Sequence, residues 1–214
     1  MMFTEQQKQR IGRRIAEIEA RTGAEVVTTL AARCDNYPEI PWKAFALGTA
    51  LAATAIAGHR ALSPAWAAGT PLVLVSVMLG AGLVFALATL AWPAWARCFL
   101  DRGRAEVEAR QYAESLFLHH ELFGTRGRNG ILILIAEFEH EIVILPDRDV
   151  RERVAAAEWL EVVARMLPEL KRGAPAEAFE AGLAAVEAVL RAHGYTTGGG
   201  RDELPGRLDG KTPS

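Results

Sequence analysis

The sequence contains few cysteines and no excess of basic charge. Cys34 and Cys98 are the only two cysteines in 214 residues. The two thiols could lie near each other, but isolated thiols in a chain without a secretory signal are more often reduced, and we expect both to be reduced. The formal net charge of −2 argues against the clustered basic surface of a nucleic-acid-binding protein, and we expect no nucleic-acid partner. Motifs of the P-loop, GxSxG, HExxH and paired CxxC types are also absent, which leaves the standard nucleotide, serine-nucleophile and zinc chemistries unsupported.

Charge is missing from the middle of the chain as well. No charged side chain occurs between Ala61 and Ala96, and a shorter apolar run extends from Ala44 to Gly58. Residues 1–23, by contrast, are rich in charge and have no apolar core of the kind that a secretory signal needs. Since an uncharged run of about 18 residues or more is long enough to cross a bilayer as a helix, the sequence predicts an internal membrane segment.

This membrane segment is expected to be a transmembrane hairpin over residues 42–97, with helices at roughly 42–60 and 71–97. Its immediate partner is then the lipid bilayer. Gly80 and Gly82, in the second span, permit a close approach of the two helices.

The basic residues around the hairpin predict its orientation. Only Arg60 lies in the connecting loop, whereas six basic residues flank the outer ends: Arg33, Lys43, Arg97, Arg102, Arg104 and Arg110. Because positive charge is retained on the cytoplasmic side, we expect a two-pass protein of the bacterial inner membrane with both termini in the cytoplasm.

The remaining sequence has the periodicity of an α/β domain. Helices are predicted at about 4–22 and 104–122 and over two segments between 150 and 193; strands are predicted at 24–31, 130–136 and 141–145. The first two strands are joined by a crossover helix and should be parallel, while the third returns antiparallel. We therefore expect a small three-layer domain with a mixed sheet, that is, a βαββ core plus flanking helices, interrupted by the hairpin. Its N-terminal part is residues 1–41, its C-terminal part is residues 98–193, and residues 194–214 form a flexible tail.

Short motifs in this domain resemble a known family. The segment Arg21-Thr22-Gly23-Ala24-Glu25-Val26-Val27 resembles the opening of the TPM domain, the family of photosystem II repair and thylakoid-lumen proteins and their bacterial relatives. Thr125–Gly130 and Ile142–Asp147 resemble the rest of its core, and the ending Asp202–Pro205 is similar to a bacterial membrane branch in which a hairpin splits the domain. The resemblance implies the family's fold. It implies no single activity, since some members are described as phosphatases, some as metal-binding proteins and others as assembly or auxiliary factors.

The predicted topology brings two polar segments to one edge of the sheet. Arg126, Arg128 and Asn129 precede one strand, and Asp147 and Asp149 follow its antiparallel partner. The two carboxylates are suitable oxygen ligands for Ca²⁺ or Mg²⁺, and the arginines are suited to holding a phosphate or another anion. The alternative is a structural turn in which an arginine forms a salt bridge with Asp147. The sequence leaves both interpretations open.

Two functions from different classes are consistent with these features. The first is a membrane-anchored TPM-like domain that acts as an interaction, assembly or auxiliary factor for another membrane protein or complex. The second is a divalent-metal-dependent phosphohydrolase that uses the Asp147 edge. The sequence identifies no catalytic residue for the second function and no particular partner for the first.

Overall fold

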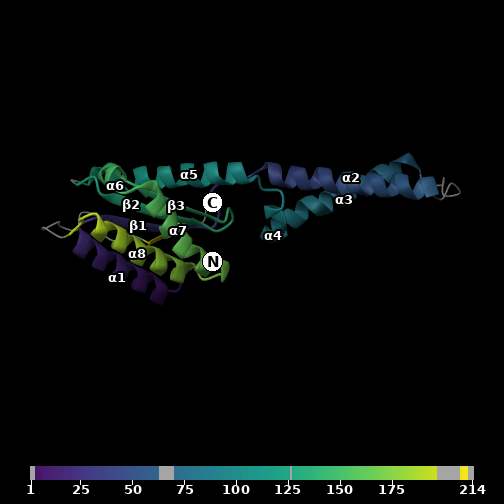
Figure 1. The fold of residues 1–214 in the computed structure, drawn as a ribbon. Helices are drawn as coiled ribbons and strands as arrows, with labels where there is room; N and C mark the ends of the chain where they lie inside the picture. Colours follow the sequence, from purple (N-terminus) through teal and green to yellow (C-terminus); the bar gives the residue numbers. More distant parts are fainter. Residues whose placement is uncertain (1–2, 63–69, 126, 197–207, 212–214) are drawn as a thin grey trace. The chain divides into compact units, whose positions relative to one another are not determined.

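The computed structural model describes residues 3–62, 70–125, 127–196 and 208–211 (Figure 1). The chain divides into two compact units. The first comprises Met1–Cys34 and Glu106–Ser214, and the second is the intervening segment Asp35–Ala105. Each unit is described by itself.

The first unit is an α/β domain built on a mixed sheet. The sheet order is β3-β2-β1-β4, in which β1 and β2 are parallel and β2 and β3 are antiparallel. Its strands are β1 (Glu25–Ala31), β2 (Gly130–Ala136), β3 (Glu141–Pro146) and β4 (Leu208–Lys211); its helices are α1 (Glu5–Thr22), α5 (Arg102–His119, whose first residues belong to the second unit), the 3₁₀ helix η2 (Leu122–Gly124), α6 (Arg148–Arg153), α7 (Ala156–Lys171) and α8 (Pro175–Ala192).

Local signals in the sequence account for the first helix. Thr4 caps the N-terminus of α1, where its hydroxyl accepts a hydrogen bond from the backbone of Gln7 and the Gln7 side chain bonds back to the Thr4 backbone. Gly23 ends the helix at φ 69°, a left-handed conformation that glycine adopts without a steric penalty. Ile11 and Ile15 on the inner face are fully buried. The helix predicted at 4–22 is confirmed.

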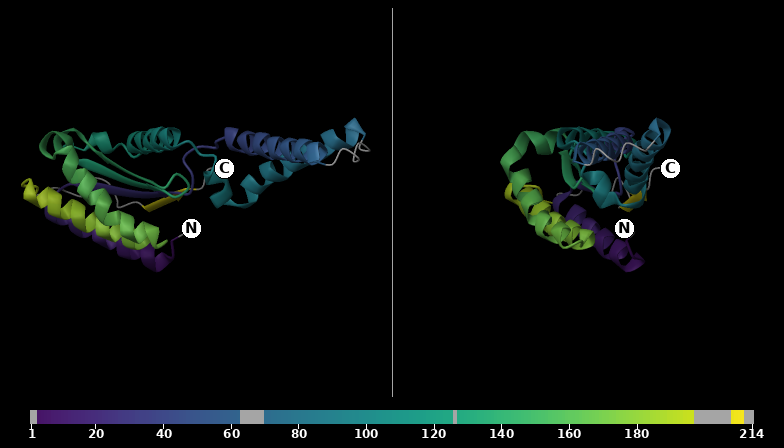
Figure 2. Two further views of the ribbon diagram at one scale, coloured as in Figure 1. Left: turned by 45° about the vertical axis from the view of Figure 1, so that its right-hand side comes forward. Right: turned by 90° about the vertical axis from the view of Figure 1, so that its right-hand side faces the viewer.

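Helices cover both faces of the sheet. One core joins α1, α7 and α8 to the sheet, and includes Ile15, Val26 and Phe179. The other joins α5 and η2 to the opposite face through residues such as Leu116 and Leu134. Figures 1 and 2 show α5 on one side of the sheet and α1, α7 and α8 on the other. The predicted three-layer α/β architecture is therefore confirmed, and it explains why every residue of β1 and β2 is buried.

Three local features differ from the sequence interpretation. The helix predicted to end near residue 122 ends at His119, because Glu121 adopts φ 52° and η2 follows. Asp147 is the N-cap of a short helix, α6, and Asp149 lies within it, whereas the sequence predicted no helix at these two residues. In the predicted tail, residues 208–211 form β4, which pairs in parallel with the second half of β1. This pairing depends on long-range hydrogen bonds, which sequence periodicity does not report.

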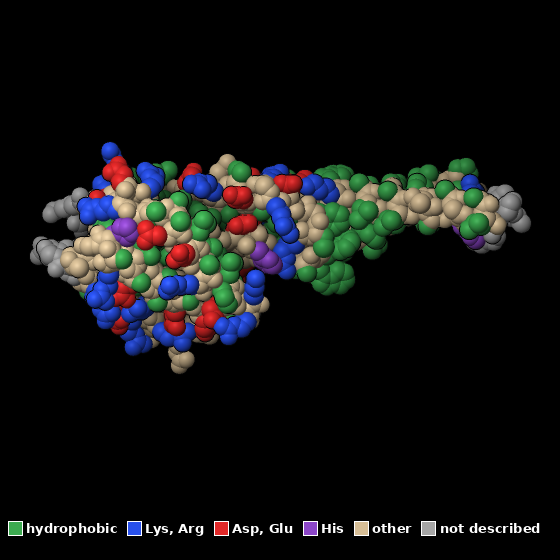
Figure 3. Space-filling view, in the orientation of Figure 1, with side chains coloured by type: hydrophobic (Ala, Val, Ile, Leu, Met, Phe, Trp, Pro, Cys, Tyr) green, Lys and Arg blue, Asp and Glu red, His purple; other side chains and the backbone are tan. Residues whose placement is uncertain are grey.

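The second unit is a helical hairpin. It consists of α2 (Glu39–Leu62), α3 (Pro71–Ala91) and the short α4 (Pro93–Arg97). The second predicted span, 71–97, is divided at Trp92 because Pro93 disfavours helical backbone in the residue before it. Both α2 and α3 are long and apolar enough to cross a membrane, and apolar side chains cover much of the hairpin surface in Figure 3.

Glycines set the spacing between α2 and α3. A Cβ atom added to Gly48 would lie 2.8 Å from both the Ala81 carbonyl oxygen and the Phe85 ring, and one added to Gly82 would meet the Phe45 ring at 2.9 Å. Each glycine thus receives a phenylalanine of the other helix, in the way that small residues allow close helix packing in membranes. Gly80 has no atom within 4 Å of its Cβ position, so of the two glycines singled out in α3 only Gly82 lies in the contact.

Polar contacts tie together the two ends of this unit. Arg104 forms 3.0 Å ion pairs with both Asp35 and Glu39. The Lys43 ammonium donates a 3.2 Å hydrogen bond to the Phe99 carbonyl oxygen. The beginning and end of the segment are therefore fixed next to each other, as a hairpin requires.

Candidate functional site at the Asp147 edge

Asp147 lies where β3 ends and α6 begins. Its backbone N–H donates a 2.7 Å hydrogen bond to the Gly130 carbonyl oxygen, which extends the β2–β3 ladder by one residue. Its carboxylate caps α6, because Oδ1 accepts a 2.7 Å hydrogen bond from the backbone N–H of Arg148. The Asp147 side chain is only 5% exposed. A charged carboxylate at this depth needs partners, since burying an unpaired charge is costly.

Arg128 supplies the opposite charge. Its Nε lies 3.1 Å from Asp147 Oδ2, an ion pair whose alignment falls short of a hydrogen bond. Its Nη1 donates a 2.8 Å hydrogen bond to the Phe123 carbonyl oxygen. The Arg128 backbone adopts φ 49°, a left-handed conformation that is unfavourable for an arginine. The contacts of the side chain are therefore formed from a strained backbone position.

The turn before β2 is fixed at two further points. The Asn129 side chain donates a 2.5 Å hydrogen bond to the Gly23 carbonyl oxygen at the end of α1. Gly130 approaches η2 so closely that a Cβ atom there would lie 2.8 Å from the Leu122 carbonyl oxygen. Glycine is thus required at the first position of β2 by a close backbone contact.

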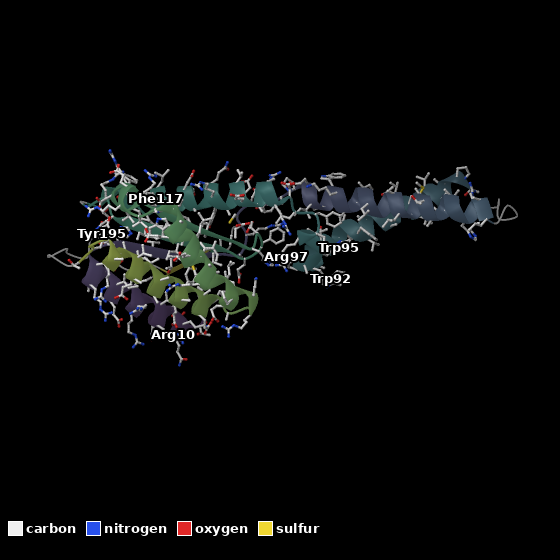
Figure 4. All side chains as sticks on the ribbon, in the orientation of Figure 1. Arg10, Trp92, Trp95, Arg97, Phe117 and Tyr195 are labelled. Carbon is white, nitrogen blue, oxygen red and sulfur yellow. The ribbon has the colours of Figure 1, made fainter. Side chains whose placement is uncertain are left out.

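Asp149 makes a separate set of contacts. Its Oδ1 pairs with Arg153 Nη2 at 2.9 Å, one helical turn away in α6. Its Oδ2 accepts a 2.7 Å hydrogen bond from the hydroxyl of Tyr195, which follows α8 and is labelled in Figure 4. Burial and the adjacent Asp149 carboxylate raise the pKa of the Tyr195 hydroxyl. The Asp149 side chain thus fastens α6 to the end of α8.

The geometry brings only part of the predicted site together. Arg128, Asn129 and Asp147 meet at one edge of the sheet, with Arg128 paired to Asp147 as the salt-bridge alternative describes. Asp149 reaches the same edge through its backbone N–H, which donates a 3.1 Å hydrogen bond to the Arg128 carbonyl oxygen. Arg126 lies outside the described residues. Within the described ranges, no group of three or more His, Cys, Asp or Glu side chains is placed to hold a metal ion.

A second polar cluster occurs at the opposite end of the sheet. The Cys34 backbone N–H donates a 2.8 Å hydrogen bond to Glu139 Oε1. Burial, the Glu139 carboxylate and then Glu108 raise the pKa of the Cys34 thiol. Burial and the carboxylates of Glu106 and Glu139 also raise the pKa of Glu141. The Cys34 thiol is consequently kept protonated and is a poor nucleophile at neutral pH. The residues of this cluster come from three separate segments (Cys34 after β1, Glu106 and Glu108 in α5, and Glu139 and Glu141 around the start of β3), so only the pairing of β1 with β2 could have indicated it.

A groove of about 990 Å³ along α1 and α8 lies apart from both clusters. Arg10, labelled in Figure 4, pairs across it with Glu177 at 3.3 Å and with Glu180. Arg14, also on its wall, forms a 2.7 Å ion pair with Glu187. These arginines already have carboxylate partners, and we assign them to the packing of α1 on α8.

Known proteins resemble this chain in fold over nearly its whole length and in sequence over residues 101–189. The NMR structure of the BA42 protein from the psychrophilic bacterium Bizionia argentinensis is similar in fold, with a TM-score of 0.59 and 14% sequence identity over 98% of this chain and 97% of that chain. A search of curated proteins gives no match. Residues 101–189 match the family model described as the TPM domain, and this segment contains α5, β2, β3, α6 and α7. A TPM domain is therefore present in this chain over residues 101–189.

Proposed function

We propose that the protein is a membrane-anchored TPM-like domain that acts as an interaction, assembly or auxiliary factor for another membrane protein or complex. The observation that carries this proposal is the exposure of the apolar helices. In the most apolar windows of α2 and α3, only 17% and 11% of residues, respectively, are buried. A core helix of a soluble protein would have one side covered. Long apolar helices with so few buried residues are suited to the hydrocarbon core of a lipid bilayer.

The contacts at the Asp147 edge support a structural part for its two carboxylates. The Asp147 carboxylate is engaged by Arg128 and by the first turn of α6, and Asp149 by Arg153 and Tyr195. These contacts explain the positions of the two carboxylates as parts of the fold. In this proposal the hairpin holds the TPM domain at a membrane, where the domain contacts other membrane proteins.

The proposed location is the bacterial inner membrane, with two spans and both termini in the cytoplasm. The support is the excess of basic residues at the outer ends of the hairpin, compared with Arg60 in its loop. A reporter that is active only outside the cytoplasm, fused after Ser214, should be silent. The same reporter fused between α2 and α3 is the positive control, and activity of the Ser214 fusion would contradict this orientation.

Crosslinking and affinity purification from native membranes would test the interaction role. The full-length protein should retain a membrane protein that is lost when Arg128 and the neighbouring surface of the domain are altered by substitution. In a control protein, residues 42–97 are replaced by a flexible linker. This control separates binding by the domain from binding by the hairpin. Recovery of the same proteins with an unrelated two-pass hairpin would contradict the proposal.

The alternative is a divalent-metal-dependent phosphohydrolase that uses the Asp147 edge. The observation that favours testing this alternative is the buried Asp147 carboxylate, which lies next to an arginine in a strained backbone conformation. A bound ion must stabilise the folded state by about 2.7 kcal/mol at a hundredfold excess over Kd. This alternative requires that Ca²⁺ or Mg²⁺ raise the melting temperature, and that Asp147→Asn abolish the rise. An unchanged melting temperature in both ions would argue against it.

A further inference from the structure

The sheet ends in β4 on one side and in β3 on the other. The four-residue β4 pairs with Thr28–Ala31 of β1, while the Val26 N–H at the start of β1 donates a 2.9 Å hydrogen bond to Glu19 Oε1. At the other edge, β3 has β2 as its one neighbouring strand within the described sheet. All six residues of β3 are half-buried, between the α5 layer and the layer formed by α1, α7 and α8 (Figure 1). With six residues against four in β4, β3 is therefore the longer of the two edge strands in the described sheet.

The register shows which backbone groups this edge presents. The Asp147 N–H bonds to the Gly130 carbonyl oxygen, and β3 pairs antiparallel with β2 from that point. In an antiparallel ladder, alternate residues direct their N–H and C=O groups to the same neighbour. Val143 and Leu145 therefore bond to β2, whereas Ile142 and Ile144 direct their backbone groups outward. Across the part of the chain that the structure describes, no backbone hydrogen bond joins these two isoleucines to another segment.

The composition of β3 leaves this edge unprotected. The strand has the sequence Glu-Ile-Val-Ile-Leu-Pro, with four consecutive apolar residues, of which the three β-branched ones have high β-propensity. Edge strands that must stay unpaired usually carry lysines, bulges or an interior proline. Here the proline stands last, at Pro146, and removes only the outermost donor of the edge.

We propose that β3 is a self-association site, at which a second copy of this chain adds its own β3 antiparallel across a two-fold axis at Val143. In this register Ile142 lies opposite Ile144 of the second copy. Because each isoleucine contributes one outward N–H and one outward C=O, the pair and its symmetry mate form four hydrogen bonds. None of these bonds needs the N–H that Pro146 lacks. The two four-stranded sheets become one continuous sheet.

Charge and backbone conformation select this register over its neighbours. A two-fold axis at Ile144 would place Glu141 opposite Asp147 of the second copy, and like charges in opposite positions are destabilising. An axis at Ile142 would place Ile144 opposite His140, whose φ of 58° cannot continue a strand. With the axis at Val143, Glu141 lies opposite Leu145, and the apolar residues of the two strands face one another.

Cysteine crosslinking in native membranes tests both the contact and the register. In a Cys34→Ser, Cys98→Ser background, Val143→Cys places two thiols on the axis. Residues in such a non-hydrogen-bonded pair have Cα atoms about 4.5 Å apart, within the range that a disulfide spans. We expect an oxidised species of twice the 23.2 kDa chain mass. The matched control, Leu145→Cys, lies opposite Glu141 and should give little of it.

An edge-blocking variant provides the second measurement. Ile144→Pro removes an outward N–H and leaves the hydrogen bonds to β2 intact, so it should keep the cooperative melt and convert the full-length protein in detergent from dimer to monomer. Equal crosslinking of Val143→Cys and Leu145→Cys, or a monomeric parent protein, would overturn the proposal. Crosslinking of Val143→Cys to a different membrane protein would also overturn self-association, although it would support the interaction role. If Ile144→Pro does not fold, the crosslinking comparison alone decides.

Discussion

Arg128 Nε lies 3.1 Å from Asp147 Oδ2, and this ion pair joins the turn before β2 to the helix that follows β3. The two partners differ in exposure. The Arg128 side chain is 49% exposed, while that of Asp147 is 5% exposed. Removing one partner therefore leaves either a solvated guanidinium or a buried carboxylate. The two losses should not cost the same free energy.

This difference in exposure predicts that Asp147→Asn and Arg128→Gln destabilise the protein by unequal amounts. Asp147→Asn retains a good N-cap residue and leaves Arg128 in water, so we expect a loss below about 1 kcal/mol. Arg128→Gln leaves the Asp147 carboxylate buried with only its helix cap, and should cost about 1–3 kcal/mol. Denaturant unfolding of both variants and of the double variant measures the coupling. A larger loss for Asp147→Asn would show that the carboxylate itself has a role beyond this pair.

The hairpin contact predicts different outcomes for two glycines of α2. Gly48→Ala forces a Cβ atom against the Ala81 carbonyl oxygen, so α2 and α3 must separate, at a cost of about 1–3 kcal/mol. Gly58→Ala is the matched control, because no atom lies within 4 Å of its Cβ position and alanine favours a helix. Thermal unfolding of the full-length protein in detergent should rank Gly48→Ala well below Gly58→Ala. Equal melting temperatures would contradict the close packing at Gly48.

The two cysteines should differ in reactivity. Burial and Glu139 raise the pKa of Cys34, whereas Cys98 is exposed. Since the thiolate is the reactive form, and each pKa unit changes its fraction about tenfold, a maleimide at neutral pH should modify Cys98 at least tenfold faster. Glu139→Gln keeps an acceptor for the Cys34 N–H but removes the charge, so it should accelerate labelling of Cys34. Mass spectrometry of timed samples measures both rates; an unaltered Cys34 rate would contradict the assigned cause.

The raised pKa of Glu141 predicts a pH dependence of stability. Burial, Glu106 and Glu139 raise the pKa of this carboxyl above its usual value of 4.5, so the folded state binds its proton more tightly than the unfolded state. Its contribution to stability is therefore largest below pH 4.5 and is lost as the pH rises through the raised pKa. Glu141→Gln should match the parent protein in acid and exceed it in stability at neutral pH. Urea unfolding between pH 4 and 8 tests this, and a parallel pair of curves would contradict it.

Local sequence signals account for much of the fold. The capping box at Thr4, the glycine at position 23 and the isoleucine stripe of α1 act within a few residues of one another, and the helix appears as expected. Likewise, the continuous apolar run of β2 predicts a strand covered on both faces, and β2 is fully buried. β4 could not be foreseen, because Leu-Asp-Gly-Lys is a poor strand sequence and its four residues depend on an edge that β1 provides.

The sequence by itself determined that this protein has an α/β domain interrupted by two helices able to span a membrane, because periodicity and the absence of charge are properties of short stretches of chain. Only the tertiary structure decided what the polar residues contact. It paired Arg128 with Asp147, directed Asp149 to Tyr195, and placed Cys34 beside Glu139. These contacts join residues that the chain keeps far apart, and their geometry is set by sheet register and helix packing, which no local pattern encodes.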